Sequence, residues 1–288
     1  MARILIVGNA TLDIINVVDR YPQEDQEVRA LAQHTSRGGN AANTAVVLSQ
    51  LGHHCNWAGS LADEPGGVMI REDLAQKGID LSAVHTVNQG KVPTSYITLS
   101  QQNGSRTIVH YRDLPEYPAE KFTTIALDRF DWLHVEGRNL SELKKMLQHA
   151  KAVAPHLPIS LEAEKPREGI EALFSLAEVV MFSQDFAMHH GAHSAAAFLQ
   201  QMQPHHAKAL LTCTWGEDGA YALPPGEKLQ HVPAFSPERV VDTLGAGDVF
   251  NAGLIDQLVR GNKPNQALVE AARLAGRKCG MHGLDNIF

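Results

Sequence analysis

The hydrophobic positions of the chain form short runs that alternate with helical patterns. Residues 3–8, "RILIVG", are an apolar run that ends at a glycine, which is typical of a buried strand. Similar runs recur along the chain, with helical patterns between them. The further predicted strands are 55–62, 131–137, 158–164, 179–183 and 208–214. The predicted helices are 39–52, 66–78, 141–153, 194–203 and most of the last 40 residues.

Two stretches break this alternation. Residues 13–21 have partial strand character, and 94–111 hold two β-rich runs around Asn103-Gly104, a strong hairpin signal. Alternating strands and helices predict an α/β fold with a mainly parallel sheet covered on both faces. We expect the β-rich stretches to form a small lid over the strand ends, where ligands of such sheets bind. The expected domains are a large α/β domain, 1–12, 36–90 and 113–288, and a discontinuous β lid, 13–35 and 91–112.

Composition narrows the class of protein. Of the 288 residues, 44% are apolar and 20% are charged, an ordinary balance for a globular enzyme. The net charge of −7 argues against a nucleic-acid surface, and no apolar run approaches the roughly 20 residues of a membrane span. The three cysteines are far apart and odd in number, a poor disulfide framework. We therefore expect a cytoplasmic protein without nucleic-acid or membrane partners.

The segment 240–254, "VVDTLGAGDVFNAGL", is suited to bind an anion. Gly245, Ala246 and Gly247 stand where a loop should become a helix, and the N–H groups at a helix start attract anions. Asp248 would repel that anion, but it makes sense as the base for a hydroxyl that attacks the anion, as in phosphoryl transfer. A glycine turn with Asp248 as a helix-capping residue explains the same pattern. These residues alone do not decide between the two interpretations.

A second segment, 37–52, "RGGNAANTAVVLSQLG", indicates a site for a polar ligand. Gly38-Gly39 precede Asn40, which is suited to cap the helix, and Asn43. Three residues apart on a helix, the two amides share a face. Amides both donate and accept hydrogen bonds, as sugar hydroxyls require. The alternative is a glycine turn with asparagine caps.

Together, "DTLGAGD" and "GGNAANTA" resemble the two signatures of the ribokinase-like sugar kinases, also called the phosphofructokinase-B family. Both motifs are long, and their joint occurrence at this separation is specific. The resemblance implies a three-layer ribokinase-like fold with a β lid, and an ATP-dependent sugar kinase. Within the family it is similar to the ketohexose kinases, which convert D-fructose or a similar ketose to the 1-phosphate. This closer likeness involves 19–29, 37–52, 103–111, 134–139, 162–168, 239–252 and 275–280.

The resemblance also implies roles for single residues. Asp248 matches the family's catalytic base, and Gly245, Ala246 and Gly247 match its anion hole. Cys279 lies near the position of the family's adenine pocket, although a small buried residue explains it equally. The residues that match sugar-binding positions are Asp13, Gly39, Asn40, Asn43 and Asp248. The residues that match ATP-binding positions are Arg106, Gly216, Glu217, Asp218 and Gly219, with the three residues of the anion hole.

The resemblance further implies ATP and Mg²⁺ as cofactors, and it leaves K⁺ open. Family relatives of this kind have lids that clasp in a homodimer, which would also cover a small sheet that no helix covers. Asp25 falls in the stretch that would reach toward the partner's site. We therefore expect a homodimer joined through the β lid, with a small-molecule sugar and ATP as ligands.

The sequence departs from the family where magnesium is concerned. Many members carry Asn-x-x-Glu after a strand, and here Ser183 and Phe186 occupy those two positions, with Asp185 only a weak substitute. Glu162 and Glu164 could reach the site through water. The favoured interpretation pairs them with Lys165 and Arg167 instead. The metal ligands are therefore unknown at this stage.

Two alternatives to a ketohexose kinase remain. One is a kinase of the same family for another sugar or a nucleoside. The other is a sugar- or nucleotide-binding regulator without turnover, against which the intact loop 245–247 with Asp248 argues. The sequence does not fix the sugar, because selection among hydroxyls depends on side-chain placement.

Overall fold

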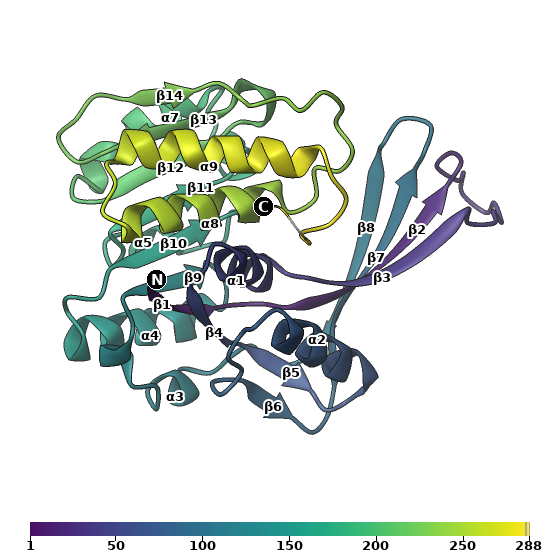
Figure 1. Ribbon diagram of the computed structural model, residues 1–288, viewed down its shortest axis with the longest axis horizontal. Helices are drawn as coiled ribbons and strands as arrows, with labels where there is room; N and C mark the ends of the chain where they lie inside the picture. The colour runs from purple at the N-terminus through teal and green to yellow at the C-terminus, as the bar shows by residue number, and fades with distance from the viewer. Residues whose placement is uncertain (286, 288) are drawn as a thin grey trace.

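The computed structural model describes residues 1–285 and 287, and its centre is an eight-stranded sheet (Figure 1). The strand order is β14-β13-β12-β11-β10-β9-β1-β4. The six strands from β12 to β4 run parallel, and β13 and β14 are added antiparallel at one edge. The strands are β1 (Arg3–Val7), β4 (His54–Ala58), β9 (Trp132–Glu136), β10 (Ile159–Ala163), β11 (Val179–Phe182), β12 (Leu210–Thr214), β13 (Ala220–Leu223) and β14 (Gln230–Val232). The predicted mainly parallel α/β fold is confirmed.

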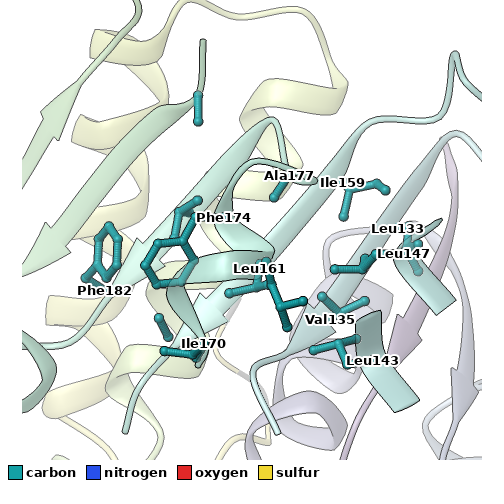
Figure 2. Close-up of a cluster of buried hydrophobic side chains, with 14 of the residues drawn as sticks. Leu133, Val135, Leu143, Leu147, Ile159, Leu161, Ile170, Phe174, Ala177 and Phe182 are labelled. Atoms are coloured by element: carbon teal, nitrogen blue, oxygen red, sulfur yellow. The ribbon is translucent and has the colours of Figure 1, made fainter. Parts of the chain in front are cut away.

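Helices cover both faces of this sheet because its central strands are apolar on both sides. One face packs on α1 (Asn40–Gln50), α2 (Pro65–Gln76), α8 (Ala246–Val259) and α9 (Pro264–Cys279). The other face packs on α3 (Ala119–Phe122), α4 (Leu140–Val153), α5 (Glu171–Phe174), α6 (Gln184–His189) and α7 (Ala195–Met202). Figure 2 shows part of this second core, where Leu143 and Leu147 of α4 lie over Leu133 and Val135 of β9. Short 3₁₀ helices are η1 (Leu127–Arg129), η2 (Gln203–His205) and η3 (Gly216–Asp218).

A four-stranded sheet, β3-β2-β7-β8, projects from the main body (Figure 1). Its strands are β2 (Thr11–Val18), β3 (Ala32–Gly38), β7 (Lys91–Ser100) and β8 (Arg106–Asp113). The predicted hairpin within 94–111 is confirmed as the antiparallel pair β7–β8. We call this sheet the lid sheet, and its separation as a domain with the expected boundaries stays a prediction. A further two-stranded sheet pairs β5 (Ser60–Ala62) with β6 (His85–Val87).

Three local expectations need correction. The predicted strand 55–62 is two strands, β4 and β5, which belong to different sheets. The lid sheet was expected to meet no helix, but α2 packs against β2, β3 and β7 at its base. Asn40 does not cap α1, because the N-cap is Gly39. Gly39 has a φ of 96°, and a Cβ atom at this position would lie 2.5 Å from the Asn9 carbonyl oxygen, so the position requires glycine. Within residues 1–285 and 287, none of the helices has the length and apolar character needed to cross a bilayer.

Candidate active site

Three of the predicted site residues, Asn40, Asn43 and Asp248, lie near the carboxyl ends of β1, β9 and β10, where the helices α1 and α8 begin. The backbone N–H of Asn9, just after β1, donates to Glu136 Oε2 at the end of β9 at 2.8 Å. The backbone N–H of Ala42 in α1 donates to the Asn9 carbonyl oxygen at 3.3 Å. Thr44 of α1 donates to the Asp248 carbonyl oxygen of α8 at 3.4 Å. The strand ends and both helix N-termini therefore form one connected edge, the usual ligand position in an α/β sheet.

The start of α8 is arranged to receive an anion. Gly245 is its N-cap and has a left-handed backbone, with φ of 78°. No side chain of the described residues caps this end. The backbone N–H of Ala246 donates to the Thr243 carbonyl oxygen at 3.2 Å, so the amides of Gly245 and Gly247 are the ones better placed to meet a ligand. Arg106, at the tip end of β8, donates to Thr243 Oγ1 at 3.3 Å. The lid sheet thus places a guanidinium beside the segment that leads into this helix.

Asp248 lies in the first turn of α8, and its side chain is buried. Asn43 Nδ2 donates to Asp248 Oδ2 at 2.6 Å. Burial raises the pKa of the Asp248 carboxyl to about 8; the Asn43 hydrogen bond opposes this, and the Glu164 and Glu136 carboxylates add to it. A carboxyl with a raised pKa is a stronger base once it is ionised, which suits proton abstraction from a hydroxyl near neutral pH.

Glu162, at the end of β10, lies inside the site and does not form the expected surface ion pair. Its Oε1 accepts from Asn40 Nδ2 and from Asn251 Nδ2, both at 3.1 Å, and Asn40 Nδ2 also donates to Glu164 Oε2 at 3.1 Å. Burial, followed by the charge of Asp248, raises the pKa of Glu162 well above its usual value. The interpretation as ion pairs with Lys165 and Arg167 is therefore wrong, because β10 ends with Glu162 directed into the site. Glu162 Oε2 has no hydrogen-bond partner among the described atoms.

Asp13 lies on β2, at the base of the lid sheet, and is buried. Its Oδ1 accepts from Thr11 Oγ1 at 2.8 Å. Burial raises the pKa of Asp13, although hydrogen bonds from Thr11 and Ser95 and the charge of Arg37 oppose that rise. The charge of Arg37 also lowers the pKa of Asp248, so one guanidinium lies close to both carboxylates.

The predicted sugar residues lie in three different surroundings. Asn43 donates to Asp248 and accepts from Arg37, and the charge of Arg37 also acts on Asp13. Asn40 turns instead toward Glu162 and Glu164. Gly39 supplies the turn between β3 and α1. Their roles as sugar ligands stay predictions.

The predicted nucleotide loop follows β12 at the same edge of the sheet. Gly216, Glu217 and Asp218 form η3 and are exposed, so their groups are accessible to a ligand. Gly219 is buried with φ of 94°, and a side chain at this position would collide with the backbone of residues 232–234, at the end of β14. The loop thus has a fixed turn and an exposed rim, and its contact with ATP stays a prediction.

The end of α9 anchors the segment that precedes the glycine turn at 245–247, the predicted anion site. Lys278 is fully buried, and its Nζ donates to Asp242 Oδ2 at 2.6 Å, to the Asp242 carbonyl oxygen at 2.8 Å and to the Met281 carbonyl oxygen at 3.3 Å. The carbonyl oxygen of Cys279 accepts from the backbone N–H of Val241 at 2.7 Å. Because a buried ammonium needs such acceptors, these contacts hold the segment in one place.

The family's magnesium positions do not supply ligands here. Ser183 Oγ donates to the Glu164 carbonyl oxygen at 2.5 Å and caps α6, and Phe186 is fully buried. Across the described part of the chain, no three His, Cys, Asp or Glu side chains form a group that could hold a metal ion. The described residues therefore do not form a protein cage for Mg²⁺.

Several residues of the site were not predicted. Asn9 lies just after β1, Glu136 is the last residue of β9, and Asn251 lies one helical turn after Asp248. Two signals in the sequence could have predicted these residues. Asn9 and Glu136 are polar residues at the end of a buried strand, and Asn251 lies on the same helix face as Asp248. Arg37 precedes the glycine pair and contacts Asn43, with Nη1 donating to Asn43 Oδ1 at 2.6 Å.

A buried carboxylate beside an open helix N-terminus provides the base and the anion site that transfer of a phosphoryl group to a hydroxyl requires. Fold and site together define the class of small-molecule kinases with an α/β fold. The chain belongs to the pfkB family of carbohydrate kinases, whose family model matches residues 1–287. The predicted family and the predicted carbohydrate kinase are confirmed.

Individual relatives agree with this family. The chain is 48% identical over 295 residues to a protein of Mus musculus named ketohexokinase, covering 99% of this chain and 98% of that one. Among solved structures, the ribokinase of Giardia lamblia superposes with a TM-score of 0.85 at 18% identity, covering 100% and 97% of the two chains. The ribokinase of Arabidopsis thaliana, complexed with ribose and ATP, gives a TM-score of 0.82 at 21% identity, covering 98% and 95%. These structural matches support the fold.

Proposed function

We propose that this protein is an ATP-dependent ketohexokinase that phosphorylates D-fructose, or a similar ketose, at the C1 hydroxyl. The observation that carries the proposal is the 48% identity over nearly the whole chain to the mouse protein of that name. The arrangement of Asp248 beside the uncapped start of α8 supports the same reaction. Three free thiols support a reducing compartment such as the cytoplasm.

In the proposed reaction, Asp248 is the general base. The sugar hydroxyl oxygen attacks the γ-phosphorus of ATP, a new oxygen–phosphorus bond forms, and the bond to the bridging oxygen of ADP breaks. The hydroxyl proton passes to an oxygen of the Asp248 carboxylate. The hydrogen bond from Asn43 to Asp248 Oδ2 holds the carboxylate in place. Sugar phosphate and ADP are the two products.

The charge on the transferred group is stabilised from two sides in this proposal. At the start of α8, the N–H groups of Gly245 and Gly247 face the phosphoryl group in this proposal, and that of Ala246 would have to leave the Thr243 carbonyl oxygen to join them. Arg106 and the loop 216–219 contact the rest of ATP. A Mg²⁺ ion that accompanied ATP would have to be held mainly by the nucleotide's own phosphate oxygens and by water, and it would neutralise part of the phosphate charge.

A panel of acceptors tests the substrate. ADP release is measured with D-fructose, other ketoses, D-ribose, D-glucose and adenosine, each with and without K⁺. We expect fructose to give a kcat/KM at least about tenfold above ribose and adenosine, a preference of roughly 1.4 kcal/mol. Carbon–phosphorus coupling in the NMR spectrum of the product should place the phosphate on C1. A preference for ribose or adenosine would make this a different kinase of the family, and no ADP release with any acceptor would support a regulator.

The proposed assembly is a homodimer in which two lid sheets cover each other. Tyr96 of β7 and Val109 of β8 are opposite each other and are 40% and 64% exposed, and Ile108, on the other face, is 46% exposed. The outer strands β3 and β8 also present open edges. An isologous contact with a second lid would remove these apolar side chains from water.

We expect light scattering at micromolar protein to give about twice the monomer mass of 31.4 kDa. The double variant Ile108→Glu/Val109→Glu places a charge on each face of β8 and should give a monomer. Val153→Glu at the end of α4 is the matched control, since Val153 is 56% exposed and α4 lies on the opposite side of the molecule from the lid sheet (Figure 1). A monomeric, fully active wild type would refute the dimer, and a dimer that survives the double variant would refute only the role of the lid.

Subunit mixing tests the expected reach of Asp25 into the partner's site. A heterodimer of an Asp25→Ala subunit and an Asp248→Asn subunit has both lesions in one site and neither in the other, provided that Asp25 acts across the interface. Activity should then reappear on co-expression of the two inactive variants. If Asp25 acts within its own subunit, both sites carry one lesion and no activity returns.

A further inference from the structure

Four side chains from four different elements form one chain of hydrogen bonds that ends at Asp248. Asp73 of α2 accepts from Arg37 Nε at 2.6 Å, and Arg37 Nη1 donates to Asn43 Oδ1 at 2.6 Å. Asn43 Nδ2 then donates to Asp248 Oδ2 at 2.6 Å. The side chain of Arg37 is only 5% exposed, and that of Asp73 is 32% exposed. The base is therefore connected to a strand of the lid sheet and, beyond it, to α2.

The arginine determines which end of the Asn43 amide faces the base. An amide has a donating NH₂ and an accepting oxygen of similar shape, so its orientation depends on its neighbours. A guanidinium has only donors, and Arg37 therefore holds Oδ1 of Asn43 toward itself. The NH₂ group is left to face Asp248. Without Arg37, the amide can turn and place its oxygen against the carboxylate, where the two would repel each other.

Arg37 also opposes an otherwise acidic environment. The charged groups around Asp248 are the carboxyl groups of Glu136 on β9, Glu162 on β10 and Glu164 just after it, together with the guanidinium of Arg37. Burial is the main cause of the raised pKa of Asp248, and the hydrogen bond from Asn43 and the charge of Arg37 both lower it. Loss of Arg37 would weaken both opposing effects at once.

We propose that Arg37 is a positioning residue of the kinase, which is anchored by Asp73 and fixes the Asn43 amide so that it donates to the catalytic base. This inference rests on the proposed function, in which Asp248 takes the hydroxyl proton. Arg37 acts through Asn43 and transfers no proton itself. Its place on β3, one residue before Gly38-Gly39, makes the geometry of the base depend on the position of the lid sheet.

The test is the pH dependence of kcat in the full-length enzyme. For Arg37→Gln we expect the acid limb of the profile to move to higher pH by about one unit, because the ionised base loses about 1.4 kcal/mol of stabilisation. At pH 7 this lowers kcat about tenfold, while the KM for ATP stays within about twofold. Asp73→Asn should move the limb in the same direction by less, and it keeps the test available if Arg37→Gln does not fold.

The matched control is Arg71→Gln. Arg71 is an arginine of α2 that contacts Thr86 and lies outside the chain of hydrogen bonds, so its loss should leave the pH profile unchanged. A purely structural role for Arg37 would lower the melting temperature without moving the limb. A raised sugar KM with an unmoved limb would make Arg37 a sugar ligand, and either result overturns the proposal. If Asp248→Asn itself kept full activity, the base assignment would fail first, and the two failures are thus distinguishable.

Discussion

Replacing Asp248 by asparagine is expected to lower kcat by about two to four orders of magnitude, because the variant keeps the shape of the side chain and removes the base. This corresponds to roughly 3–5 kcal/mol of activation free energy. The uncapped amides at the start of α8 remain, so ATP should bind with nearly its original Kd. Steady-state kinetics and calorimetric titration of ATP measure the two effects separately.

Stability gives an independent control for the same variant. Burial raises the pKa of Asp248 to about 8, so ionisation of this carboxyl becomes a cost to the folded state as pH rises above its unfolded value. Asparagine does not ionise, and the melting temperature of Asp248→Asn at pH 8 should not fall below that of the wild type. A kcat close to the wild-type value would end the assignment of Asp248 as the base. A large loss of melting temperature would attribute the lost activity to the fold.

Asp13→Ala is expected to raise the KM for the sugar by about ten- to a hundredfold, while the KM for ATP changes by less than about twofold. A charged acceptor of a hydrogen bond contributes about 1.5–3 kcal/mol, and Asp13 is a buried carboxylate at the base of the lid sheet. Asp19→Ala is the matched control, because Asp19 is an exposed aspartate just after the same strand.

Deoxy sugars extend this prediction to a single hydroxyl. If Asp13 accepts from one hydroxyl of the sugar, the analogue that lacks this hydroxyl should be a poor substrate of the wild type. The same analogue should lose little more in Asp13→Ala, since the interaction is already absent. A rise in the ATP constant instead would show that the sugar site is wrongly placed. For Asn43→Ala we expect a fall in kcat as well as a raised sugar KM, because Asn43 also donates to Asp248.

Local patterns were sufficient where one segment determines its own structure. The apolar run 3–8 became β1, the turn at Asn103-Gly104 joins β7 to β8, and the small residues 245–247 begin α8. The third pattern also predicted Asp248 in the first turn of that helix, where the structure has it. In each case the periodicity or the turn residues act within a few residues of chain.

The sequence was insufficient where the sheet brings distant segments together. β1 lies between β4 and β9, so Asn9 meets Glu136, 127 residues later. Glu162 was paired with neighbours in sequence, and the strand order placed it against Asn40 and Asn251 instead. Arg37 lies on a mostly exposed strand, and its partner Asp73 comes from α2, 36 residues later in the sequence. Such contacts depend on tertiary neighbours that no local pattern specifies.

The end of α9 offers a practical opportunity for spectroscopy. Of the three thiols, Cys55 and Cys213 are buried and burial raises the pKa of each to about 12, whereas Cys279 is partly accessible. Burial also raises the pKa of Cys279, so alkylation should be carried out at mildly alkaline pH. Its backbone already binds Val241, ahead of the anion-binding turn. An environment-sensitive fluorophore attached there would report in real time on movements of that turn, without any change to the native sequence.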